Sequence, residues 1–175
     1  MANAITETVW FPSVALAAFL CCTTALAETD SAVRPPPIYI DRGACPFECC
    51  IYRRWTVNHP TPLLNRPDGK KALGSLGVGE IVEGITGEVR SAPIPVKADR
   101  DMSGTPIKAG DTYYVLHYNG EGLWKVWIRG RLALVGQGVR VPDPKADWWV
   151  KVKDARGNVG WALSTGNFDH QDRCE

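Results

Sequence analysis

Four of the six cysteines of this chain, those outside residues 1–27, are the residues whose type and spacing point most directly to chemistry. Cys45, Cys49 and Cys50 form a CPFECC cluster, and Cys174 lies far along the sequence from them. Cysteines in an oxidising compartment usually form disulfides. Because a bond between the neighbours Cys49 and Cys50 would need a strained eight-membered ring, we expect Cys45 to pair with one of them and Cys174 with the other.

The cysteines have two other possible roles. Four thiolates could hold zinc, although adjacent ligands fit poorly around a tetrahedral ion and no second spaced pair accompanies them. A cysteine hydrolase would need a thiolate near a histidine, and the three histidines are spread over a Pro-rich loop, a strand and the tail: His59, His117 and His170. His117 alternates with tyrosines, so we expect a hydrogen-bonded sheet residue.

Carboxylates are the other residues that could support catalysis. A glycan hydrolase would need a pair of them, and the candidates are Glu80, Glu83, Glu88 and Glu121. Glutamates are common on exposed turns and strand edges, so their presence is weak evidence for a catalytic pair. The sequence therefore predicts a protein that is not an enzyme and that needs no metal and no cofactor.

Aromatic side chains in the middle of the chain form a candidate binding site. Residues 112–118 and 123–129 are predicted strands with aromatic residues on both faces. One face must enter a core, and the other could form an exposed shelf for a peptide or glycan, lined by Tyr113, Trp127 and Arg129. The alternative is that a neighbouring lobe covers this second face.

Short strands must position these residues. Apolar and polar residues alternate over 52–57, 72–76, 80–86, 112–118, 123–129, 131–135, 148–153 and 159–163. The turn Asp154-Ala155-Arg156-Gly157 predicts that the last two strands form a hairpin, which needs further strands to be stable in water. Because no window has a helical period, the sequence predicts an all-β fold.

The Gly-punctuated order of these strands resembles that of the bacterial SH3 (SH3b) family. The similar segments are Leu-Asn-Arg-Pro-x-Gly at 64–69, Gly-Ser-Leu at 74–76, Gly-Glu-Ile-Val at 79–82 and Trp-Val-Lys-Val…Gly-Asn-Val-Gly-Trp within 149–161. The resemblance implies an SH3-like small barrel, usually in exported proteins that bind wall or envelope partners. In such a barrel the closing hairpin packs on the first strands, so we expect Trp161 in the core near Leu76 and Val82.

The chain departs from that family in residues 88–147, which intervene before the closing hairpin. The strands of this insert predict a three-stranded β-meander. The meander either extends the barrel or forms a second lobe. We expect the SH3b-like β domain, including this insert, to span residues 45–175.

The N-terminal segment is expected to direct export. No charged residue occurs from Thr8 to Ala27, and the run ends in an A-x-A site, so residues 1–27 are predicted to be a signal peptide. Because Glu7 and no basic residue precedes the run, the alternative is an uncleaved anchor of about 20 residues. Residues 28–44 contain three consecutive prolines and are predicted to be a stiff linker.

Charge and export together narrow the function. The formal net charge is +1 and no basic stripe occurs, which argues against a nucleic-acid partner. We expect a periplasmic or secreted cell-envelope binding or structural module that recognises a wall peptide, glycan or partner protein through loops 58–70 and 87–110. It would contact a membrane only if the N-terminal segment is uncleaved. The alternatives are a secreted inhibitor of a lysozyme or protease, and a Cys-dependent wall hydrolase.

Overall fold

The computed structural model describes residues 33–136 and 141–174, and its elements there are β-strands. They are β1 (Tyr39–Arg42), β2 (Arg54–Val57), β3 (Thr61–Leu64), β4 (Ala72–Leu76), β5 (Ile81–Ser91), β6 (Ile94–Lys97), β7 (Thr112–Gly120), β8 (Leu123–Ile128), β9 (Arg131–Val135), β10 (Ala146–Lys153), β11 (Val159–Ser164) and β12 (Phe168–Asp169). The predicted all-β fold is confirmed. The expected signal peptide lies outside the described residues, and within them we find no helix suited to crossing a bilayer.

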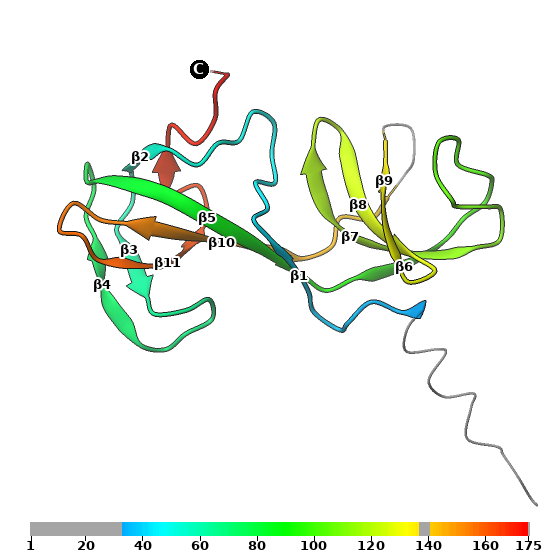
Figure 1. Ribbon diagram of the computed structural model, residues 1–175, viewed down its shortest axis with the longest axis horizontal. Coiled ribbons are helices and arrows are strands. Elements are labelled where there is room, and N and C mark those ends of the chain that lie inside the picture. The colour runs from blue at the N-terminus through cyan, green and yellow to red at the C-terminus, as the bar shows by residue number, and fades with distance from the viewer. Residues whose placement is uncertain (1–32, 137–140, 175) are drawn as a thin grey trace, which may run out of the picture.

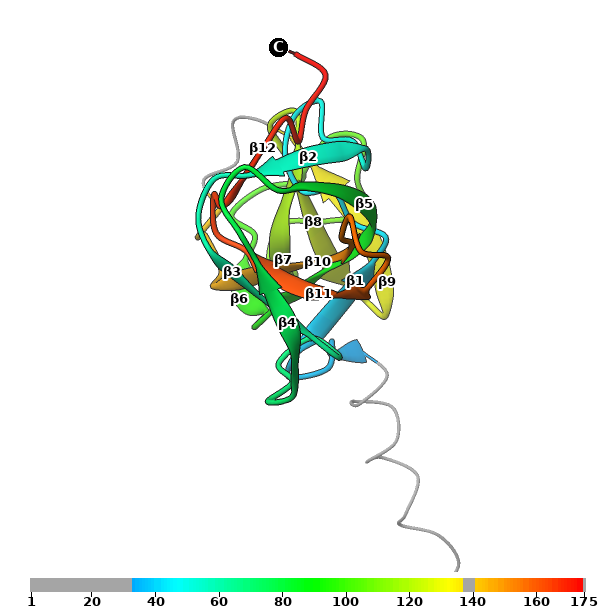
Figure 2. The same ribbon diagram turned by 90° about the vertical axis from the view of Figure 1, so that its left-hand side faces the viewer.

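The strands form two sheets that lie side by side (Figure 1). An eight-stranded sheet has the order β12-β2-β5-β10-β11-β3-β4, with β1 also paired to β5, and a four-stranded sheet has the order β6-β7-β8-β9. The larger sheet is strongly curled, as the end-on view shows (Figure 2). We call the eight-stranded part the first lobe and the four-stranded part the second lobe.

The second lobe is an insertion in the chain between β5 and β10 of the first lobe. It contains four strands where three were predicted, because residues 94–97 pair with β7 as an extra edge strand. It also has a core of its own, which consists of Ala98, Ile107, Tyr113, Val115, Val126, Ile128 and Val135. Of the two arrangements left open for the insert, the structure therefore has the separate lobe.

The concave side of the curled sheet holds the core of the first lobe. Its buried members are Trp55, Val57, Leu63, Leu76, Val82, Val150, Val152, Ala162 and Phe168. On β10 the inward residues are Val150 and Val152, and the hairpin register sets them opposite Ala162 and Gly160. Trp161 therefore faces the other way and is half-buried outside this core, so its predicted core position is wrong.

The hairpin between β10 and β11 is closed by hydrogen bonds within its own turn. The Gly157 N–H donates to the Asp154 carbonyl, and Gly157 has φ +87°, which a glycine adopts without strain. The Asp154 carboxylate accepts hydrogen bonds from the backbone N–H groups of Arg156 and Asn158. Burial would raise the pKa of this carboxyl, but the hydrogen bonds from Asn158 and Arg156 outweigh it and hold the pKa below its usual value.

Replacing Gly160 with alanine is expected to destabilise the first lobe. A Cβ at this position would lie 2.6 Å from Leu63 Cγ and 2.8 Å from the Leu64 carbonyl oxygen, so β3 would have to shift. We expect the free energy of unfolding in urea to fall by about 1–3 kcal/mol. Gly74→Ala in β4 is the control, because a Cβ there meets nothing within 4 Å. Equal stability of the two variants would contradict the packing described here.

Residues 39–42, which were predicted to belong to a stiff linker, form strand β1. They pair with β5 in the register Tyr39↔Ser91 to Arg42↔Glu88. The linker prediction is therefore wrong for these four residues. The pairing partner lies about fifty residues away in sequence, a separation at which local composition gives no signal.

Two disulfides fix the segment between β1 and β2. They join Cys45 to Cys50 and Cys49 to Cys174, as the ring-strain argument predicted. The tail is also hydrogen-bonded to this segment, because the Ile51 N–H donates to the Gln171 carbonyl and the Arg173 N–H donates to the Cys49 carbonyl. The cysteine loop, residues 45–50, is therefore held at both ends.

Candidate functional site

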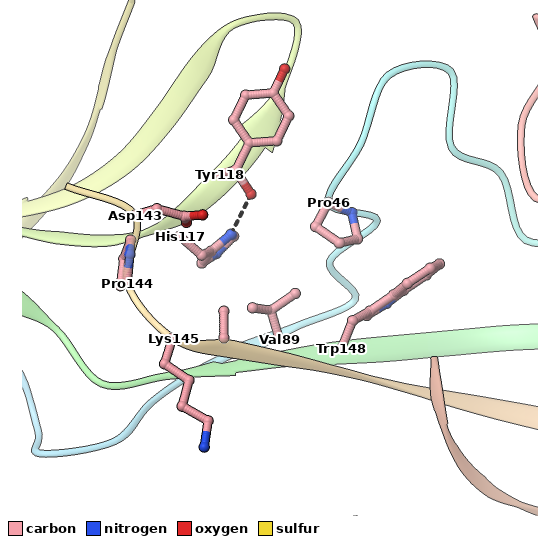
Figure 3. A pocket seen from close by; sticks show the side chains of 9 residues that line it. Pro46, Val89, His117, Tyr118, Asp143, Pro144, Lys145 and Trp148 are labelled. Carbon is pink, nitrogen blue, oxygen red and sulfur yellow. Dashed lines mark hydrogen bonds between the residues drawn. The ribbon is translucent and has the colours of Figure 1, made fainter. Parts of the chain in front are cut away.

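A cleft of about 450 Å³ lies between the two lobes (Figure 3). His117 and Tyr118 of β7 line one side, and Val89 of β5 and Trp148 of β10 line the other. Pro46 of the cysteine loop and residues 143–146 complete the lining. We call this hollow the interlobe cleft. Boundaries between lobes are common places for ligand sites, so it is the principal candidate site of the described residues.

An ionic network joins the lobes beside the cleft. His117 is 2% exposed, and its Nε2 lies 2.9 Å from Asp41 Oδ2 while its Nδ1 lies 2.6 Å from the Tyr118 carbonyl oxygen. The Lys125 ammonium of β8 also donates to Asp41 Oδ2. Burial would raise the pKa of Asp41, but the hydrogen bonds from His117 and Lys125 outweigh burial and lower it. One carboxylate on β1 is thus bonded to two strands of the second lobe.

The aromatic wall of the cleft is positioned by the cysteine loop. Phe47 meets the Trp148 ring edge-on, with ring centroids 5.4 Å apart. Trp148 Nε1 donates to the Tyr52 hydroxyl at 3.4 Å, and that hydroxyl donates to the Ala44 carbonyl. Burial raises the pKa of Tyr52. The disulfides fix residues 44–50, which supply the contacts to Trp148 and Tyr52. The Trp148 indole is therefore held in place before any ligand binds.

The cleft lining contains one acidic and one basic side chain, Asp143 and Lys145. Asp143 lies next to His117 at one end, whereas the Lys145 side chain points away from the hollow (Figure 3). At the other end the Tyr118 hydroxyl faces Glu48 Oε1 at 3.4 Å. Because both ring nitrogens of His117 already have partners in the fold, the cleft offers aromatic side chains and the Asp143 carboxylate to a ligand. This arrangement suits a ligand with an apolar part and an amine.

The structure separates the three residues of the predicted aromatic shelf. Tyr113 is 1% exposed in the core of the second lobe, so its expected place on the shelf is wrong. Trp127 is half-buried on the opposite face, where the register pairs it with Tyr114 and its Nε1 donates to the Val33 carbonyl. Val33 therefore reaches this face, whereas the alternative interpretation had expected a neighbouring lobe to cover it.

Arg129 lies in the two-residue turn between β8 and β9. Its guanidinium donates to both carboxylate oxygens of Asp111 at 2.7 Å. The hydrogen bond from the Lys108 N–H and then those from Arg129 lower the pKa of Asp111. Arg129 is thus engaged in an ion pair within the second lobe. That Trp127 and Arg129 contact a ligand remains a prediction.

The other residues that could support catalysis have structural partners. Glu88 is buried and accepts a hydrogen bond from Arg90, Glu80 accepts one from the Gly77 N–H, and Glu83 lies 4.0 Å from Lys153. Glu121 sits at a positive φ in the β7–β8 turn. Over the residues that the structure describes, we find no cluster of His, Cys, Asp and Glu that could hold a metal ion.

Sequence reasoning did not single out Asp143 and Trp148 of the cleft, or Asp41 and Lys125 beside it. Trp148 was expected in a strand, but its role depends on the contact between the lobes, which no local pattern encodes. No family model, no curated protein and no solved structure matched this chain. The function proposed for it rests on its sequence and its geometry.

Proposed function

We propose that this protein is an exported binding module of the cell envelope, and that its interlobe cleft binds a short wall peptide through a free amine. The observation that carries the proposal is the cleft itself, a hollow lined by Trp148 and Tyr118 with Asp143 at its end. Aromatic faces with a few placed polar groups are typical of ligand sites. Asp143 supplies the negative charge that an amine needs.

The disulfides support the exported location. Disulfides persist in the periplasm and outside the cell and are rare in the cytosol. Both pairs involve the segment that lines the cleft, so an oxidising compartment would also be needed to keep the site in shape. The SH3-like character proposed for the first lobe is supported by its curled antiparallel sheet, in which the closing hairpin β10–β11 pairs with β5 through β10.

Binding is a better account of the cleft than catalysis. The pairing of Cys45, Cys49, Cys50 and Cys174 leaves none of these four as a thiolate nucleophile. His117 uses both ring nitrogens to hold the lobes together. The remaining lining groups are apolar or aromatic, apart from Asp143 at the end and Lys145 directed away.

Titration with a lysine-terminated tripeptide tests this proposal. We expect Asp143→Asn to weaken binding about fivefold, close to 1 kcal/mol, because an exposed ion pair contributes about that much. Acetylation of the lysine amine should have a similar effect on the parent protein. The matched control is Asp99→Asn, since Asp99 is also exposed and lies outside the cleft lining. The readout is isothermal calorimetry, beside co-sedimentation with purified peptidoglycan.

Two outcomes would overturn the proposal. Binding that is unchanged by both Asp143→Asn and amine acetylation would remove the cleft as the amine site. Failure to sediment with peptidoglycan, together with capture of a purified lysozyme or protease, would favour the inhibitor instead.

A further inference from the structure

The two hydrogen bonds of His117 need a hydrogen on each of its ring nitrogens. Nδ1 lies 2.6 Å from the Tyr118 carbonyl oxygen, and Nε2 lies 2.9 Å from Asp41 Oδ2. A backbone carbonyl only accepts hydrogen bonds, and so does an ionised carboxylate. A neutral imidazole carries one N–H and one lone pair, so it can donate to one of these partners and not to both. His117 therefore makes both bonds only as the positively charged imidazolium.

Asp41 does not supply the missing hydrogen. Burial would raise the pKa of its carboxyl, but the hydrogen bonds from His117 and Lys125 lower it, so the group is ionised near neutral pH. The Lys125 ammonium donates to Oδ2, the same oxygen that faces the ring. An ionised oxygen that already accepts from Lys125 has no hydrogen to offer Nε2. The hydrogen between Asp41 and His117 therefore belongs to the ring.

Strands β1 and β5 present neutral side chains around this bond. Tyr39 of β1 stacks on the His117 ring with the centroids 6.4 Å apart. Burial together with the charge of Asp41 raises the pKa of the Tyr39 hydroxyl, which therefore stays neutral. The β5 side chains on the same face are Val89, opposite Asp41, and Ser91. On this side the charge that the ring meets comes from Asp41.

Further charges lie on β8 and on the segment before β10. Lys125 is the register partner of His117 on β8, and its ammonium is directed to Asp41. Asp143 lies next to the ring at the end of the interlobe cleft, while Lys145 points away from the hollow (Figure 3). Two carboxylates and one ammonium thus lie around the ring. Surroundings of net negative charge favour the positively charged form of histidine.

We propose that His117 is a protonation-dependent latch between the two lobes, in which the imidazolium bonds Asp41 and the neutral ring releases it. The bond to the Tyr118 carbonyl joins neighbours in one strand, so a ring with a single hydrogen keeps it on Nδ1. Nε2 then turns a lone pair toward the Asp41 carboxylate, which repels it. Histidine side chains gain or lose this proton between about pH 5 and pH 8. Lys125 keeps its own bond to Asp41, so the lobes loosen at the basic end of this range and do not separate.

The latch belongs to the free protein and does not rest on the proposed amine site. His117 lines one wall of the interlobe cleft, so opening of the latch changes the shape of the cleft whatever the cleft binds. Both bonds of the ring are made within the protein, without any ligand. A test on the free protein therefore separates the latch from the proposed function.

The test is an NMR titration of the full disulfide-bonded protein, without ligand, from about pH 5 to pH 8. Long-range ¹H–¹⁵N correlations show which ring nitrogens carry hydrogen, and residual dipolar couplings measure the orientation of one lobe relative to the other. We expect both His117 nitrogens to carry hydrogen at the acidic end and Nδ1 alone at the basic end. The relative orientation of the lobes should change with the same midpoint.

Three variants show which side chains the response depends on. His117→Gln removes the titrating ring and should abolish the pH-dependent change in orientation. Lys125→Met removes the second bond to Asp41 and should enlarge the change. His59→Gln is the matched control, because His59 is an exposed histidine between β2 and β3 and its replacement should leave the response of the parent intact.

The latch is contradicted by a His117 ring that carries one hydrogen at about pH 5, or that keeps two up to about pH 8. It is also contradicted by a lobe orientation that does not follow the His117 titration, and by an unchanged pH response in His117→Gln. Because the parent protein itself reports both the ring hydrogens and the orientation, the test does not depend on the folding of any variant.

Discussion

Replacing Cys49 and Cys174 together with serine is expected to lower the free energy of unfolding by about 5 kcal/mol. Their disulfide spans a sequence separation of 125 residues. In the loop-closure model, a disulfide that closes a loop of this length lowers the conformational entropy of the unfolded chain. The folded state is thereby stabilised by about 5 kcal/mol. The bond also holds the tail against the cysteine loop, where the Arg173 N–H donates to the Cys49 carbonyl. Urea unfolding of the oxidised protein measures the loss.

The second disulfide supplies the matched comparison. Cys45 and Cys50 are separated by 5 residues, so their replacement with serine should cost about 2 kcal/mol in the same model. The parent, unfolded in denaturant, should show no free thiol from these four cysteines. If the short-loop variant lost as much stability as the long-loop variant, chain entropy would not be the main contribution of the Cys49–Cys174 bond.

The elements that sequence reasoning predicted well are those whose partners are close in the chain. Strands β8 and β9 are joined by the turn Arg129-Gly130, and β10 and β11 by Asp154–Gly157, so alternation and turn chemistry together indicate both hairpins. Strand β4 at 72–76 was also predicted with its observed bounds. Strands β1 and β12 were missed, because each pairs with a strand far away in sequence. Strands β3 and β6 were also missed, since they lie in segments 58–70 and 87–110, which were predicted to be loops.

The error over Trp161 shows what hairpin register adds to a family resemblance. Trp161 was assigned to the core because the resemblance packs the closing hairpin on the first strands, yet Val150 and Val152 are the inward residues of β10. Across the hairpin they face Ala162 and Gly160, so these two small residues point inward and Trp161 points out. Counting back from the Asp154 turn would have given this result from the sequence alone. The error over Tyr113 has no such remedy, because both faces of β7 carry aromatic residues.

The candidate site was harder to predict than the fold, since it depends on contacts between lobes. His117 was expected to be a hydrogen-bonded sheet residue, and its bond to the Tyr118 carbonyl agrees. Its second partner, Asp41, comes from a segment that was predicted to be a linker. A buried histidine in one lobe and an aspartate 76 positions away share no local pattern. The position of the cleft therefore follows only from the assembled structure.

Asp41→Asn is expected to lower the free energy of unfolding by about 3 kcal/mol. The variant leaves Lys125 and His117 without their shared carboxylate, and removal of one member of a buried ionic group typically costs about 3–5 kcal/mol. We place the loss at the lower end because the side chains of Asp41 and Lys125 are 13% and 21% exposed. Urea unfolding at pH 7 measures the loss, and Asp99→Asn, which changes an exposed aspartate, is the control.

The pH dependence of the stability lost in Asp41→Asn tests whether the loss comes from the carboxylate charge. The folded-state pKa of Asp41 lies below its unfolded value of about 3.8, so the unfolded chain binds the proton more readily. The stability that Asp41 contributes is therefore fully present above about pH 5, and it is lost as the pH falls through 3.8 toward the lower folded-state pKa. The gap in unfolding free energy between the parent and Asp41→Asn should accordingly narrow between pH 5 and pH 2. A gap that stays constant over this range would mean that the asparagine perturbs packing and that the carboxylate does not hold the two lobes together.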